Sequence, residues 1–527
     1  MKLPPVFRVM LIILIVFSAC KSVPQKYEET WESLAQHEAT PEWFRDAKFG
    51  IYFHWSIYTV PEFGHEWYPH RMYTPPTERD LEKKESYLAL GEDHRFYKKY
   101  ERFNTYEFHK ETYGGAEKFG YKDFIPGFTC ENFNPEKWAD LFVKSGARFA
   151  GPVAEHHDGY ALWDSEVTPF CAGKTGPERD IVGELEKSIK ARGLKFITTF
   201  HHSKNFRMHF AGEERFKEVG LDYSAVDLSD PEYAKMYGTL PEAEFMQMWK
   251  DKLKEVIDNY EPDIIWFDSW LDQIPEEHRL EFAAYYLNRA EEWGKEVMIC
   301  HKQQDMPMDM STLDHERGAE RYITPYPWLS DDCVSPHTWS YVKDMIFYSP
   351  ERIITDFVKT VSKNGQLLFN ITPRYNGDIP EECVHILTEM GAWLERNGKG
   401  IYETRPWIIA GESDSIHFTA SKDGKILYAF SFGSSGEELL IKTLAENSGL
   451  CPWKVESVTQ LSNDRSLDFT QDEKGLSISS SDIEWDPYAT GLKITFSDFN
   501  HDAYVALQEE KMKEFEKFAT YGVRKKR

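Results

Sequence analysis

The segments KFITTFHH (residues 195–202) and DIIWFDSW (residues 263–270) decide the fold of this chain. Each is a short apolar run that ends in polar residues, as expected for a buried strand. Between the two, Trp249, Leu253 and Tyr260 recur at helical spacing, which predicts a helix with one apolar face. A strand, a helix and another strand in this order are typical of a βαβ unit in a parallel sheet.

The same alternation extends from about residue 45 to residue 400. Five more runs combine an apolar segment with a polar end: KFGIYFHW (48–55), RFAGPVAEHH (148–157), EVMICHK (296–302), STLDHE (311–316) and QLLFNITP (366–373). We expect an eighth strand near residues 338–345. No glycine-rich dinucleotide fingerprint follows the first strand, so a (β/α)8 barrel is favoured over an open doubly wound sheet.

The rest of the chain predicts a second domain. With 527 residues, the chain is longer than one hydrophobic core usually serves. After a helical segment at 383–398, short alternating runs separated by turn clusters such as SKDGK and GSSGE predict an antiparallel sheet structure. The predicted fold is therefore of the α/β class, a TIM-like (β/α)8 barrel over residues 28–405 followed by a small C-terminal antiparallel β-sandwich over 406–505. A charged tail at 506–527 follows, and the long stretch 76–126 is expected to form a βα loop over the active-site face.

Composition limits the classes of partner. The net charge of −26 argues against nucleic acid and anionic membrane surfaces, because both repel an acidic protein. The cysteines after residue 20 have no CxxC pairs and no tight spacing, so neither a zinc module nor a disulfide framework is indicated. A neutral or small substrate fits this composition better.

The N-terminus predicts export. Lys2 and Arg8 precede an apolar run at residues 9–17 that is too short to span a bilayer comfortably. The following Ser-Ala-Cys resembles a bacterial lipobox, although Phe17 stands where an aliphatic residue is commoner. We expect residues 1–20 to be a lipoprotein signal and Cys20 to be the lipidated N-terminus of a membrane-anchored protein on the periplasmic or cell-surface side. The alternative is an ordinary cleaved signal in which Cys20 is incidental.

Polar side chains lie where six different predicted strands end. In a barrel, those ends converge on one mouth, so we expect the side chains to meet there. They are His54, His156 with His157, His202, Asp268, Lys302 and Glu316. For any one histidine, a structural role at a strand end is an equally good interpretation, but agreement at six ends favours a functional site.

The run EHHDG (155–159) also raises the question of a metal site, since histidine and carboxylate are common ligands. Adjacent residues on a strand point to opposite faces, so His156 and His157 both face inward only if the strand bends or has already ended. Histidines that hydrogen-bond to sugar hydroxyls are the more economical interpretation. We expect no metal ion and no cofactor.

Asp268 in WFDSW lies between aromatic residues at the end of an apolar strand. Burying an aspartate is costly unless it is hydrogen-bonded or functional. A helix N-cap is the structural alternative, but Asp272 or Pro275 marks the next helix start better. Trp67, Trp266 and Trp270 could face a pyranose ring or fill the core.

These residues lie in blocks that resemble the retaining α-L-fucosidases of glycoside hydrolase family 29. The resemblance runs from about Trp43 to Trp407. It rests on KFGIYFHWSIYTVPEFGHEWYPHRMY, GYKDFIP, WADLFVKSGARFAGPVAEHHDGYALWDS, IIWFDSW and NGQLLFNITPRYNGDIP, in the family's order. It implies Asp268 as nucleophile and a further set of fucose contacts: His54, Glu66, Trp67, His156, His157, His202 and Trp266.

The chain departs from the family pattern at three places. Lys302 stands where many relatives have arginine, His202-Ser203 where many have Tyr-Ser, and TWSY (338–341) where WGY is more frequent. The acid/base residue must come from LDHERGAERY (313–322), which offers Asp314, Glu316 and Glu320. We assign Glu316, at the end of its predicted strand, and keep Glu320 as the alternative.

The resemblance implies a retaining exo-glycosidase that removes terminal α-L-fucose from oligosaccharides or glycoconjugates. It implies no nucleic-acid partner and a membrane association through the lipid anchor alone. A retaining enzyme for a fucose-like or galactose-type sugar, or a non-catalytic sugar-binding lipoprotein, remains an alternative. A metal-dependent hydrolase would need a dense ligand set, which the sequence does not offer.

Overall fold

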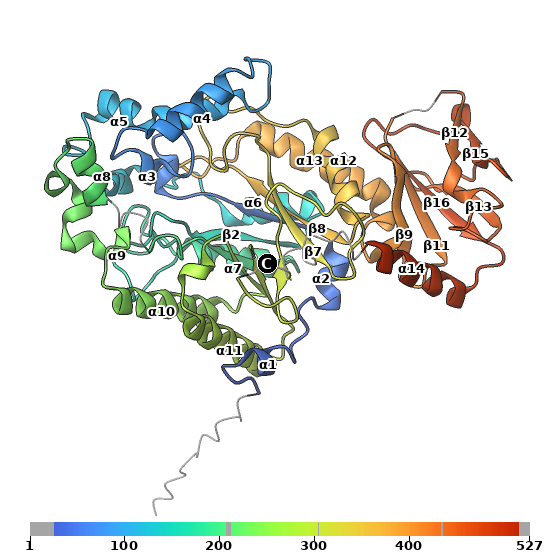
Figure 1. The fold of residues 1–527 in the computed structure, drawn as a ribbon, viewed down its shortest axis with the longest axis horizontal. Helices are drawn as coiled ribbons and strands as arrows, with labels where there is room; N and C mark the ends of the chain where they lie inside the picture. Colours follow the sequence, from blue (N-terminus) through green and yellow to red (C-terminus); the bar gives the residue numbers. More distant parts are fainter. Residues whose placement is uncertain (1–25, 207–211, 304, 434–435, 516–527) are drawn as a thin grey trace, which may run out of the picture.

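The computed structural model describes residues 26–206, 212–303, 305–433 and 436–515 (Figure 1). Cys20 and the expected signal at residues 1–20 lie outside these ranges. A parallel barrel is followed by antiparallel sheets, as predicted (Figure 1). No helix within the described ranges combines the length and the apolar character that crossing a bilayer requires.

Eight parallel strands form the barrel in the order β6-β5-β4-β3-β2-β1-β8-β7. The strands are β1 (Phe49–Phe53), β2 (Phe149–Glu155), β3 (Lys195–Phe200), β4 (Ile264–Phe267), β5 (Met298–His301), β6 (Thr312–Leu313), β7 (Trp328–Cys333) and β8 (Gly365–Ile371). Between β6 and β7 the pairing is reduced to a bridge from Asp314 to Leu329, with His315 N donating to Leu329 O at 2.9 Å. The barrel is therefore nearly closed.

The expected position of the eighth strand was wrong. It lies at Trp328–Cys333 (β7), and residues 338–345 form no strand. Three polar residues in the sequence WLSDDC interrupt the apolar pattern expected of a buried strand, although most of β7 is buried. Asp331 is tolerated there because Tyr52 Oη donates to its Oδ2 at 3.0 Å and Lys302 Nζ lies 3.1 Å from the same oxygen.

Six helices follow barrel strands and alternate with them along the chain. They are α6 (Pro135–Lys144), α7 (Ile181–Ala191), α10 (Glu242–Tyr260), α11 (Glu276–Trp293), α12 (Pro350–Val361) and α13 (Glu381–Asn397). Asn134 and Ser349 cap α6 and α12 by accepting a main-chain N–H of the first turn, and each is followed by proline at the first helical position. Trp249, Leu253 and Tyr260 of α10 are buried, so the predicted apolar face packs toward the core.

Further helices cover the carboxyl ends of the strands and the chain start. They are α1 (Trp31–Leu34), α2 (Glu42–Ala47), α3 (Tyr68–Arg71), α4 (Glu78–Leu88), α5 (Thr105–Tyr113), α8 (Gly212–Glu218) and α9 (Ala234–Tyr237). The region after β1 carries α3, α4, the 3-10 segment η2 (Tyr97–Asn104) and α5. In Figure 1, α3, α4, α5 and α8 lie together on the side of the barrel away from the C-terminal sheets.

The C-terminal region contains a five-stranded sheet, β13-β16-β11-β10-β9, and a three-stranded sheet, β12-β15-β14. The strands are β9 (Thr404–Ser413), β10 (Ile416–Ser421), β11 (Ile426–Ser431), β12 (Glu438–Ile441), β13 (Val455–Gln460), β14 (Phe469–Asp472), β15 (Gly475–Ser479) and β16 (Thr490–Phe496). Helix α14 (His501–Phe515) packs beside β9 (Figure 1). Their apolar side chains form a second core that includes Trp407, Phe418 and Ile494.

A hydrogen bond and an ion pair hold the C-terminal sandwich against the side of the barrel. Trp393 Nε1 of α13 donates to Ala489 O at 2.8 Å, and Arg405 at the start of β9 pairs with Asp46 of α2 at 2.9 Å. The described residues that line the cavity at the strand ends all come from the barrel and its loops.

Candidate active site

A cavity of about 210 Å³ opens at the carboxyl ends of the barrel strands. It brings together most of the site residues expected from the sequence. Those that line it are His54, Glu66, Trp67, His156, His157, Asp268, Lys302 and Glu316. Convergence of separate strand ends on one cavity is the arrangement of active sites in barrels of this kind.

Asp268 follows β4 directly, and its main-chain N donates to Phe200 O at 3.0 Å, which fixes the strand end against β3. Its Oδ1 lies 3.0 Å from Lys302 Nζ, and its Oδ2 lies 3.1 Å from His201 Nδ1 and 3.7 Å from His157 Nε2. Burial alone would raise the pKa of this carboxyl. The Lys302 ammonium and His201 outweigh burial and hold the pKa well below its usual range, so Asp268 is ionised.

His156 and His157 both face the cavity because β2 has already ended at Glu155. The chain turns at Gly159, which has a φ of +73° and where a side chain would collide with Met236 O. Burial lowers the pKa of His157 and of His54 to about 3, so both rings are neutral at physiological pH. A neutral imidazole offers one donor and one acceptor, which suits sugar hydroxyls.

We expected His202 to lie at the mouth of the barrel, and this prediction was wrong. Its ring stacks on Trp249 of α10, with centroids 5.6 Å apart and planes 14° apart, and it does not line the cavity. His201 takes that place. β3 ends at Phe200, and the side chains of neighbouring residues point in different directions. An error of one residue in the predicted end of this strand therefore exchanges the histidine that faces the cavity for the one that faces the helix layer.

Lys302 lies beside four carboxylates. Besides Asp268, its Nζ lies 3.1 Å from Asp331, 3.3 Å from Glu316 and 3.9 Å from Asp314. Burial alone would lower the pKa of Lys302, but these carboxylates raise it well above the usual range. Burial and the neighbouring Asp331 raise the pKa of Asp314 well above its ordinary value, which favours the protonated form of this carboxyl.

The two candidate acid/base residues occupy different environments. Glu316 lines the cavity and its side chain is 48% exposed, facing solvent near the nucleophile. Glu320 is buried, lies outside that cavity, and its Oε1 is 3.1 Å from His315 Nε2. The geometry therefore favours Glu316 as the carboxylate that reaches a leaving group.

Aromatic and acidic side chains form the remaining walls. Trp67 and Trp270 meet edge to face at 5.6 Å and both line the cavity. Trp266 was expected to contact the sugar, and its placement in the cavity wall was wrong: it is fully buried beneath the cavity, with Lys302 Nζ 4.9 Å from the centre of its ring, and does not line it. Glu66 accepts a hydrogen bond from Trp339 N at 3.0 Å, which fixes one carboxylate oxygen.

Sequence reasoning missed several residues of the cavity. They are His201, Asp331, Lys99, Arg102, Arg317, His337 and Trp339. His201 follows the end of β3 and carried the same polar signal as the residues that were found, whereas Asp331 lies within β7, a strand that the sequence pattern did not reveal. Lys99 and Arg102 come from η2, far from any strand, and nothing in their local sequence marks them.

Two groups of side chains have the spacing of metal ligands: His54, His156 and His201, and His157, His201 and Asp268. The second group already holds a counter-ion, because the Lys302 ammonium lies 3.0 Å from Asp268. A cation there would be repelled by that ammonium. Hydrogen bonding to hydroxyls and attack by the Asp268 carboxylate are the chemistry that this arrangement supports.

Two carboxylates that line one small cavity at the mouth of a barrel are typical of glycoside hydrolases, and the chain falls in that class. The family model described as Alpha-L-fucosidase matches residues 14–399. The chain belongs to the α-L-fucosidase family and is an enzyme of that kind, a glycosidase acting on α-L-fucose.

Individual relatives agree with this membership. The chain is 28% identical over 422 residues to plasma α-L-fucosidase of Homo sapiens, and this match covers 77% of this chain and 78% of the relative. The crystal structure of Thermotoga maritima α-fucosidase matches with a TM-score of 0.67 and 28% identity, covering 89% of this chain and all of that one. Its complex with fucose matches with a TM-score of 0.64 and 27% identity, covering 89% and 99%.

Proposed function

We propose that the cavity binds terminal α-L-fucose and that Asp268 and Glu316 hydrolyse its glycosidic bond in two steps. Asp268 attacks the anomeric carbon while protonated Glu316 gives its proton to the departing oxygen. Water then attacks the glycosyl-enzyme, and Glu316 takes the proton from that water. The sugar is released with its anomeric configuration retained.

The single observation that carries this assignment is that Asp268 and Glu316 flank one ammonium. Asp268 Oδ1 lies 3.0 Å and Glu316 Oε2 3.3 Å from Lys302 Nζ. These two oxygens cannot be farther apart than the sum of the two distances. Two carboxylates that share one ammonium in this way are compatible with the roughly 5–5.5 Å between the carboxyl groups of retaining enzymes.

Exposure supports the division of roles. The Asp268 side chain is 11% exposed and ionised, as a nucleophile at the base of the cavity must be. Glu316 is about half exposed and stands where a leaving group can depart into solvent. The neutral rings of His54, His156 and His157 are available for the hydroxyls of the sugar.

The test of this function follows the configuration of the product. An aryl α-L-fucoside is hydrolysed in the spectrometer, and the first-formed sugar is observed by proton NMR before it mutarotates. We expect α-L-fucose to form first. β-L-fucose as the first product would contradict retention, and matched rates on an aryl α-galactoside would contradict the assignment of fucose.

We also propose that the protein is a bacterial lipoprotein held to a membrane through Cys20. The proposal rests on the charged start, the short apolar run and the Ser-Ala-Cys sequence. A net charge of −26 makes unaided binding to an anionic bilayer unfavourable. In the expressing cell, Cys20→Ala should move the protein from the membrane to the soluble fraction. If the variant fractionates with membranes like the parent, the anchor is not at Cys20.

A further inference from the structure

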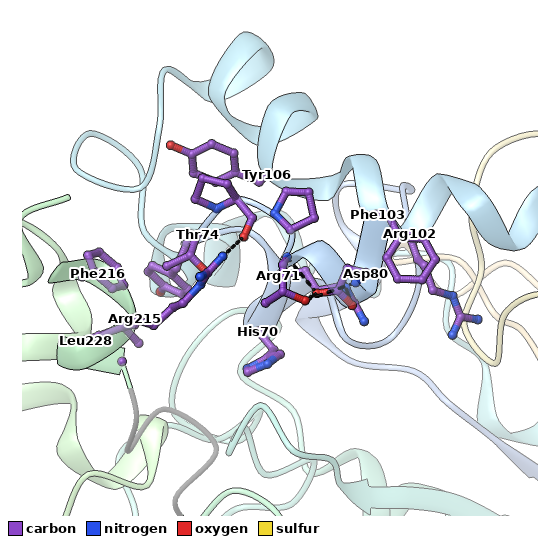
Figure 2. A pocket seen from close by; sticks show the side chains of 15 residues that line it. His70, Arg71, Thr74, Asp80, Arg102, Phe103, Tyr106, Arg215, Phe216 and Leu228 are labelled. Carbon is purple, nitrogen blue, oxygen red and sulfur yellow. Dashed lines mark hydrogen bonds and ion pairs between the residues drawn. The ribbon is translucent and has the colours of Figure 1, made fainter. Parts of the chain in front are cut away.

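A second cavity, of about 310 Å³, lies beside the first and is larger. It is formed by the region after β1, from α3 through α5, and by the region after β3 that contains α8 (Figure 2). Figure 2 shows Arg215 of α8 on one side and Arg71 with Asp80 on another. The nucleophile and the acid/base residue do not line it.

The two cavities share a wall. Arg102 lines both, and its Nη2 donates to the main-chain O of His337, which lines the catalytic cavity, at 3.0 Å. The rings of Trp67, in the catalytic cavity, and His70, in the second cavity, meet edge to face at 6.0 Å. The two cavities are therefore neighbours across Arg102.

Aromatic and apolar side chains give the second cavity the walls of a sugar subsite. Phe103, Phe216 and Leu228 line it and are buried, with the Arg71 guanidinium 4.9 Å from the centre of the Phe103 ring, and Tyr106 adds a phenol ring at the upper side of Figure 2. Flat apolar faces of this kind suit the carbon face of a pyranose ring, whose hydroxyls lie at the edge.

Its charged side chains are mainly cationic. Arg71, Arg102 and Arg215 line it, against the single carboxylate of Asp80. Arg71 Nη1 lies 3.3 Å from Asp80 Oδ1, while Arg71 Nε is buried and has no acceptor among the described residues. Arg215 Nη2 donates to Pro75 O at 3.0 Å, and its Nη1 lies 3.3 Å from Oε2 of the exposed Glu218, which does not line the cavity; the two contacts hold the guanidinium at the rim. In a chain with a net charge of −26, a cavity lined mainly by positively charged side chains is an exception.

We propose that the second cavity binds an anionic sugar unit of the substrate, carrying a sulfate ester or a carboxylate, on the leaving-group side of the fucose. Arginine suits both anions because its planar fork donates two parallel hydrogen bonds. Arg215 is the principal contact, because its side chain is 27% exposed against 23% for Arg71, and Arg71 Nε offers a second donor. This inference rests on the proposed cleavage of α-L-fucosides in the first cavity.

The experiment compares three fucosyl disaccharides with one linkage: a neutral galactoside, its sulfated form and the corresponding uronic acid. The quantity measured is kcat/KM for each anionic substrate relative to the neutral one. We expect this ratio to exceed one in the parent protein and to fall about tenfold in Arg215→Ala, as one charge-assisted contact is lost. Arg215→Lys should retain part of this preference for the anionic substrates. Lys217→Ala changes an exposed residue of the same helix outside the cavity and should retain all of the preference.

The outcomes separate this inference from the proposed function. A parent ratio of one or less overturns the anionic subsite, whatever the variants do, provided that an aryl fucoside is hydrolysed. If the aryl fucoside is not hydrolysed, the proposed function itself fails. Preference for the sulfated over the uronic substrate, or the reverse, identifies the anion. An equal fall for neutral and anionic substrates in Arg215→Ala would assign Arg215 to holding the loop and overturn its role as anion contact.

Discussion

Lys302 Nζ lies 3.0 Å from Asp268 Oδ1, inside the barrel mouth and almost out of reach of solvent. The ammonium thereby compensates the buried charge of the nucleophile. Lysine supplies a point charge in place of a planar fork, so it can meet Asp268, Asp331 and Glu316 from one position. Lys302 is thus central to the electrostatics of the site.

Removing this charge should change the pH dependence of catalysis. In Lys302→Met, burial would act on the Asp268 carboxyl without its main opposing charge, so its pKa should rise. We expect kcat/KM on an aryl fucoside to fall by about 100-fold or more and the acid limb of the profile to move to higher pH. Lys302→Arg, which keeps the charge, is the control. An unshifted acid limb in Lys302→Met would show that Lys302 does not set the ionisation of Asp268.

The acid/base assignment predicts a dependence on the leaving group. Glu316→Ala should lower kcat on a fucosyl oligosaccharide by about 10²–10⁴-fold, because a poor leaving group needs a proton, and should spare fucosylation by an activated aryl fucoside. Glu320→Ala serves as the matched variant, since Glu320 lies buried against His315. Its main effect should be a lower melting temperature. If the two variants behave in the opposite way, the roles must be exchanged.

The two adjacent histidines after β3 should respond differently to the same replacement. His202 stacks on Trp249, so His202→Phe preserves the packing and should leave kcat/KM within about threefold, with a stability change below about 1.5 kcal/mol. His201→Phe removes a ring nitrogen 3.1 Å from Asp268 and should lower kcat/KM by about tenfold or more. Steady-state kinetics and thermal melts of both variants check this. A catalytic defect confined to His202→Phe would restore the original expectation from the sequence.

Asp158 links the loop after β2 to the rest of the mouth and should make stability depend on pH. It accepts hydrogen bonds from Ser56 Oγ and Tyr121 Oη, each at 2.9 Å, and burial raises its pKa from an ordinary 3.8 to about 7. Between these two values the folded protein holds a proton that the unfolded chain has lost. This contribution to stability is therefore complete below about pH 3.8, declines as the pH rises toward 7 and is constant above that.

Melting temperatures measured from pH 4 to pH 8 test the role of Asp158. Asp158→Asn, which cannot ionise, should show a flatter profile than the parent between pH 4 and pH 7. Asp93→Asn, at an exposed position, is the control and should follow the parent. Parallel profiles for the parent and Asp158→Asn would mean that Asp158 has an ordinary pKa in the folded protein.

The sequence predicts the barrel because its strands are buried on both faces and read as continuous apolar runs, as in IIWF of β4. Asp268 was recognisable because a carboxylate interrupts such a run at its end. β7 was not recognisable as a buried strand, because its Asp331 is buried through contacts with Tyr52 and Lys302, which are remote in sequence. The choice between His201 and His202 required the end of β3 to within one residue, which local pattern does not give.

Covalent trapping tests the central claim most directly. A 2-deoxy-2-fluoro-α-L-fucosyl fluoride reacts as a substrate in the first step but slows the second, so a retaining enzyme accumulates the glycosyl-enzyme. Mass spectrometry of the proteolysed protein should find one added fluorofucosyl group, on the peptide that contains Asp268, and none in Asp268→Gly. The label on a peptide without Asp268, or normal turnover by Asp268→Gly, would contradict the assignment of Asp268 as the nucleophile.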